Sequence, residues 1–70
     1  MKKYNQNINK TLELSEKMIR IAVQGEASSE DSGCWVLYGT ILDSAYKIKQ
    51  LAEKEKKSHQ DGGKWDDDDN

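Results

Sequence analysis

Two residues of this sequence have side chains that commonly carry out covalent or metal chemistry, Cys34 and His59, and each type occurs once. If both lie on one helix, the 25 positions between them correspond to roughly 37 Å at 1.5 Å per residue. A cysteine hydrolase needs its histidine base within hydrogen-bond reach of the thiol. The spacing therefore argues against catalysis, and we expect a protein that is not an enzyme and has no catalytic residues.

Cys34 has two alternative interpretations. It is expected near the start of a helix, where the helix dipole lowers the pKa of a thiol, so redox or thiol sensing through Cys34 is one hypothesis. The sequence favours the other, in which Cys34 is a small residue buried in a helix contact. A single cysteine excludes an internal disulfide framework and a four-thiolate zinc site.

No metal site or other cofactor is expected. Glu55 and His59 are four residues apart, but a di-metal bundle needs inward carboxylates and histidines on several helices. Glu13 and Glu16 are instead predicted on the solvent side of their helix. Glu55 and His59 are therefore interpreted as solvated residues on the charged end of a helix.

Aromatic and basic residues suggest two kinds of partner surface. Aromatic side chains recur at helical spacing, and one more precedes four aspartates near the C-terminus. They could anchor a protein partner through Trp35, Tyr38, Tyr46 and Trp65. Basic side chains could bind RNA by contacting phosphates, through Lys2, Lys3, Lys10, Lys17 and Arg20. Glutamates interrupt this basic stripe and the net charge is −2, so nucleic acid is the less favoured partner.

The elements that position these residues are two helices, predicted over residues 8–24 and about 30–58. Their apolar residues sweep roughly 200° and 220°, against about 100° for a helix that rests on a single neighbour. Gly25 is expected to cap the first helix, and Ser28 or Ser29 the second. A loop of about five residues between them predicts an antiparallel helical hairpin, and the longer second helix is expected to project beyond the first.

Residues 8–60 are thus expected to form an all-α domain, between a flexible arm (1–7) and a disordered acidic tail (61–70). Seventy residues give a marginal core, and the wide apolar faces exceed what one hairpin buries. We therefore expect a homodimeric four-helix bundle. Its core or dimer interface is predicted to contain Leu12, Ile19, Leu37, Ile41, Ala45 and Ile48.

The predicted function is that of a small interaction or regulatory module. A signal peptide would require an apolar stretch after Lys2 and Lys3, whereas polar residues follow them. The longest apolar run is four residues, residues 35–38, far short of a membrane span. Together with the lone thiol, this predicts a cytoplasmic protein without membrane contact. Nothing in the sequence points to a small-molecule substrate.

Overall fold

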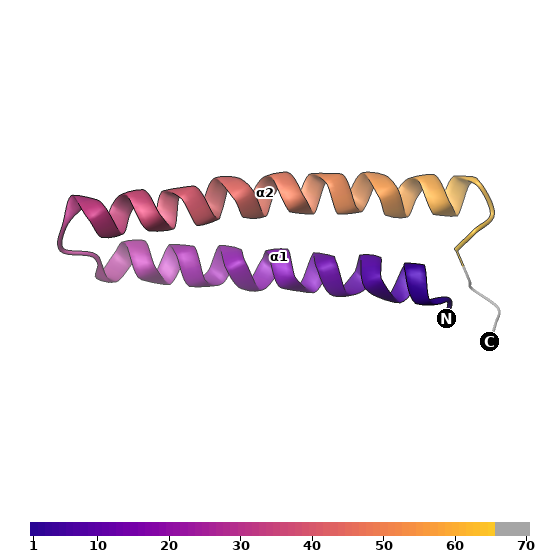
Figure 1. Cartoon of the computed structure of the whole chain (residues 1–70), viewed down its shortest axis with the longest axis horizontal. Helices are drawn as coiled ribbons and strands as arrows, with labels where there is room; N and C mark the ends of the chain where they lie inside the picture. The colour runs from indigo at the N-terminus through magenta and orange to yellow at the C-terminus, as the bar shows by residue number, and fades with distance from the viewer. Residues whose placement is uncertain (66–70) are drawn as a thin grey trace.

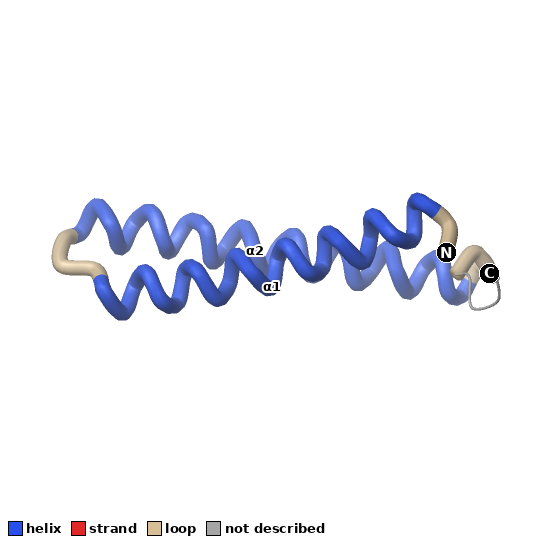
Figure 2. The backbone as a smooth tube through the Cα atoms, turned by 90° about the horizontal axis from the view of Figure 1, so that it is seen from below, coloured by secondary structure: helices blue, strands red, loops and turns tan. Residues whose placement is uncertain are grey.

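The computed structural model describes residues 1–65 of the chain. Two helices, α1 (Lys3–Ser28) and α2 (Ser32–Asp61), are joined by residues 29–31 and lie antiparallel, side by side (Figure 1). Viewed after a quarter turn, the two helices cross at a shallow angle (Figure 2). The predicted all-α hairpin is confirmed. We refer below to its loop end and to its open end, where α1 begins and α2 ends.

Small side chains line the contact between the helices. Ser15 and Ala22, one heptad apart on α1, are buried, as are Ala45 and Ala52 on α2. A seven-residue repeat of small residues lets two helices approach closely while larger residues pack on either side. Those larger residues are only half-buried, and they include four of the predicted core positions, Leu12, Ile19, Ile41 and Ile48.

The contact on α2 is displaced by one position from its predicted seam. The heptad spacing of the sequence predicts one seam on α2, formed by Leu37, Ile41, Ser44, Ile48 and Leu51. Ile41 and Ile48 are half-buried, but Leu37, Ser44 and Leu51 are exposed. The buried row is instead the neighbouring one, which contains Ala45 and Ala52. Both rows repeat every seven residues, so periodicity alone could not tell them apart.

The predicted flexible arm is wrong, because α1 already begins at Lys3. The reason is that Asn5 is fully buried between the first turn of α1 and the end of α2. The predicted projection of α2 is also wrong for the same reason, since α1 accompanies it to the open end (Figure 1). After Asp61 the chain turns at Gly62 and Gly63, and the remainder of the predicted tail, residues 66–70, lies outside the described residues.

The loop end also differs from its prediction. Gly25 is not a C-cap, since α1 continues to Ser28. Asp31, not Ser28 or Ser29, is the N-cap of α2, and its carboxylate accepts a 2.8 Å hydrogen bond from the backbone N–H of Cys34. Within the described chain, neither helix is long and apolar enough to cross a membrane.

Candidate functional site

One side of the hairpin carries exposed apolar residues from both helices, and we call this side the apolar face. Leu14 and Ile21 follow Asn7 on α1 at steps of seven residues, and Leu37 precedes Leu51 on α2 by two such steps. Asn7 and Leu51 line one common groove, which places both rows on the same side of the molecule. Leu37 and Leu51 are 52% and 57% exposed. The half-buried members of the face are Met18, Ile41 and Ile48.

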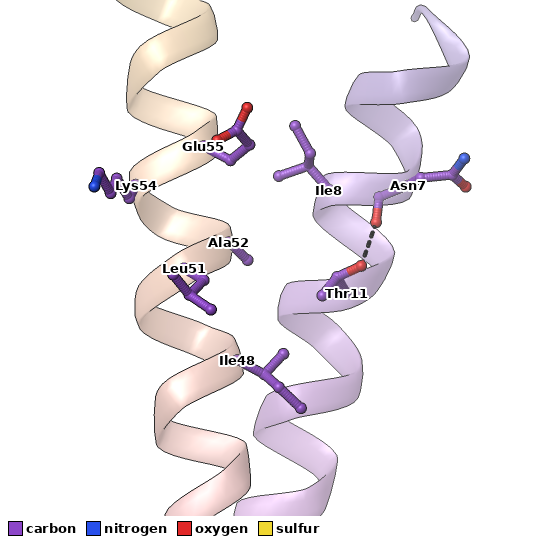
Figure 3. Close-up of a pocket in the computed structure, with 8 residues that line it drawn as sticks. All are labelled: Asn7, Ile8, Thr11, Ile48, Leu51, Ala52, Lys54 and Glu55. Carbon is purple, nitrogen blue, oxygen red and sulfur yellow. Dashed lines mark hydrogen bonds between the residues drawn. The ribbon is translucent and has the colours of Figure 1, made fainter.

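The groove is the hollow part of this apolar face and lies toward the open end. It is a shallow, open depression of about 490 Å³ between α1 and α2. Ile8 and Ile48 point into the space between the helices, whereas Asn7 and Lys54 point to its two outer sides (Figure 3). Thr11 contributes little bulk, because its hydroxyl turns back to donate a 2.7 Å hydrogen bond to the Asn7 carbonyl. Ile8 is thus the one large apolar residue that α1 contributes to the groove, which remains partly unfilled.

The opposite side carries the predicted aromatic surface, but the structure divides its four residues. Trp35 is exposed near the loop end, and Tyr46 is exposed near the centre of α2. Tyr38 is half-buried, with its ring against the backbone of α1 where a Cβ on Gly25 would overlap it. Trp65 lies at the open end, with the ammonium of Lys56 4.9 Å from its ring centroid. These aromatics do not form a single surface.

A cluster of polar groups at the open end was not anticipated from the sequence. Asn5 has no exposed surface; its amide donates a 2.8 Å hydrogen bond to the Lys64 carbonyl, and its Oδ1 lies 2.9 Å from Nδ1 of His59. The His59 ring also meets Tyr4 edge-on at a centroid distance of 5.0 Å, and its Nε2 lies 3.5 Å from Glu55. The cluster thus connects the first turn of α1 to the end of α2 and holds the two helices in register.

Asn5→Ala should destabilise the hairpin more than the same substitution at an exposed polar position nearby. It removes buried hydrogen bonds and leaves the Lys64 carbonyl without its amide donor, at a cost of about 1–3 kcal/mol. Thermal unfolding followed by circular dichroism measures the loss. Gln6→Ala is the matched control, since Gln6 is exposed and its side chain donates a hydrogen bond to the Met1 carbonyl. Equal melting temperatures for the two variants would contradict a structural role for the cluster.

Cys34 does not have the environment predicted for a reactive thiol. Its thiol lies 3.7 Å from a carboxylate oxygen of Asp31. The hydrogen bond to this carboxylate, then its negative charge, then partial desolvation raise the pKa of Cys34. The prediction of a lowered pKa at the helix start is therefore wrong, because the capping residue opposes the dipole. Cys34 is also half-exposed and not buried in the helix contact.

Asp31→Asn should make Cys34 more reactive while preserving the helix cap. Asparagine caps helices as well as aspartate does but carries no charge, so the thiol pKa should fall toward its ordinary value. More thiolate would then be present at pH 8, and alkylation by iodoacetamide should accelerate. Asp31→Ala should accelerate it too but cost about 1 kcal/mol of stability through the lost cap. An unchanged pH profile of alkylation in Asp31→Asn would contradict this account.

The remaining candidate residues are placed as follows. Lys3, Lys10 and Lys17 form one row on α1 at seven-residue spacing, beside the apolar face, and Arg20 lies on the adjacent row. Cys34 and His59 lie near opposite ends of α2. In residues 1–65, no three histidine, cysteine or acidic side chains gather as metal ligands would. No family model, curated protein or solved structure matches this chain.

Proposed function

We propose that the protein is a non-enzymatic interaction module that works as a homodimer, with two hairpins joined through their apolar faces into a four-helix bundle. The observation that carries this proposal is the exposure of Leu14, Ile21, Leu37 and Leu51 at heptad spacing along one side of both helices. Isolated exposed apolar residues need no explanation, but several gathered on one side of the molecule favour an interaction surface. A two-fold axis covers such a face with its own copy.

Sedimentation equilibrium tests the proposal directly. We expect a mass twice that of the 8.0 kDa chain at micromolar concentration, and a melting temperature that rises with protein concentration. A mass equal to one chain up to 100 µM, with a melting temperature independent of concentration, would exclude the dimer. A larger assembly would show that the apolar face does not close on a single copy.

Nucleic-acid binding is the alternative function, and the lysine row of α1 is the observation in its favour. Lys10 and Lys17 share the row, and Lys47 and Lys54 border the apolar face on the other helix. Phosphate contacts of this kind weaken steeply as salt increases. Retention on RNA at low salt, lost when Lys10 and Lys17 are changed to glutamine, would favour this alternative.

A further inference from the structure

We infer that the two hairpins of the proposed dimer run antiparallel, so that the loop end of each copy covers the groove near the open end of the other. This inference rests on the proposed homodimer and adds what fills the groove. A face-to-face dimer has two symmetric arrangements, with the hairpins parallel or antiparallel. Shape and charge along the hairpin distinguish the two.

The apolar face is bulky toward one end and hollow toward the other. Toward the loop end it presents Ile21, Leu37 and Ile41, of which the first two are exposed. Toward the open end lies the groove of about 490 Å³, where α1 contributes Asn7, Ile8 and Thr11, of which only Ile8 is large and apolar. A parallel dimer would set groove against groove and leave a void, whereas an antiparallel dimer seats the bulky end of each copy in the groove of the other. Protein interfaces favour the arrangement that fills space.

Charge is distributed just as unevenly along the hairpin. The half nearer the loop, residues 18–46, carries one cation and four carboxylates. The rest of the chain, residues 1–17 and 47–70, carries ten cations and nine carboxylates, four of them at positions 66–69 outside the described residues. A parallel dimer would place the two negative loop ends together, whereas an antiparallel dimer places each beside an open end that carries a cation excess. Charge complementarity of this kind selects the orientation of partners.

Charged residues at the two extremes of the hairpin also favour the antiparallel arrangement. Glu30 and Asp31 are exposed there, at one extreme of the hairpin. Lys3 is exposed on the first turn of α1, at the other extreme. Because α1 and α2 have nearly the same extent, two antiparallel copies in full overlap bring the acids of one close to the lysine of its partner.

Distance measurement between spin labels on Cys34 tests the orientation, and the native chain has this one cysteine. Cys34 lies about 12 residues from the centre of α2, so in an antiparallel dimer the two labels should be about 37 Å apart along the bundle. In a parallel dimer they would lie within about 20 Å, across the width of four packed helices. Pulsed electron paramagnetic resonance separates these two distances.

A second labelled variant and a mass measurement complete the test. Cys34→Ser with Lys47→Cys places the label near the centre of α2, where both arrangements give a short distance. A long Cys34 distance with a short one at position 47 supports the antiparallel dimer. Short distances from both positions, in a protein of dimeric mass, overturn the orientation alone. A monomeric mass for the unlabelled protein overturns the proposed function and this inference with it.

Discussion

Leu37→Glu should convert the dimer into a monomer. Leu37 is 52% exposed on the isolated hairpin, so a glutamate there costs the monomer little. In the dimer the change removes a buried leucine, worth about 2 kcal/mol, and requires a carboxylate to lose water. A two-fold axis applies the change twice, so the loss is about 4 kcal/mol, or roughly a thousandfold in the dissociation constant. Sedimentation equilibrium measures the change.

Val36→Glu is the matched control for this prediction. Val36 is the next residue on α2, is even more exposed at 68%, and points away from the apolar face by about 100°. The same substitution at position 36 should therefore leave the mass dimeric. Helix content should be unchanged in both variants. If both variants, or neither, become monomeric, the apolar face as defined here is not the dimer interface.

The fold class was predictable from the sequence because helical spacing and loop length are local features of the chain. Apolar residues at helical spacing and a short polar connection are sufficient to give two antiparallel helices, and the structure has both. The exact boundaries depend on contacts between residues distant in the chain. Asn5 extends α1 toward the N-terminus because it bonds groups at positions 59 and 64, and no pattern in the polar residues 1–7 reveals that pairing.

The presence of a partner surface was predictable from the sequence, but the residues that form it were not. In the sequence, the apolar residues of each helix span a wider arc than one neighbouring helix can cover, which indicated a partner surface. The exposed leucines of the apolar face agree with that expectation. Which leucines are exposed follows from the row of small residues, including Ala45, that permits closest approach. Two rows of equal period compete for the contact, and only the packing of whole helices decides between them. The effect of Asp31 on Cys34 likewise depends on which residue caps α2.

Gly25→Ala should destabilise the protein although it lies within a helix, where alanine is normally preferred by about 1 kcal/mol. The added methyl group would overlap the ring of Tyr38, which packs against the backbone of α1 at this point. Overpacking of this kind costs about 1–3 kcal/mol and exceeds the gain in helix propensity. Thermal unfolding should show a melting temperature lower by several degrees.

Gly39→Ala is the same substitution in α2, and it should stabilise the protein. A Cβ on Gly39 meets no atom within 4 Å, so the variant should gain about 0.5–1 kcal/mol from helix propensity alone. The Tyr38→Ala background isolates the cause, since removal of the ring should make Gly25→Ala stabilising as well. If Gly25→Ala still destabilises the protein without the ring, the close approach of Tyr38 is not what requires glycine. Opposite signs at positions 25 and 39 would instead show that Gly25 is selected by the packing of α2 against α1 and Gly39 is not.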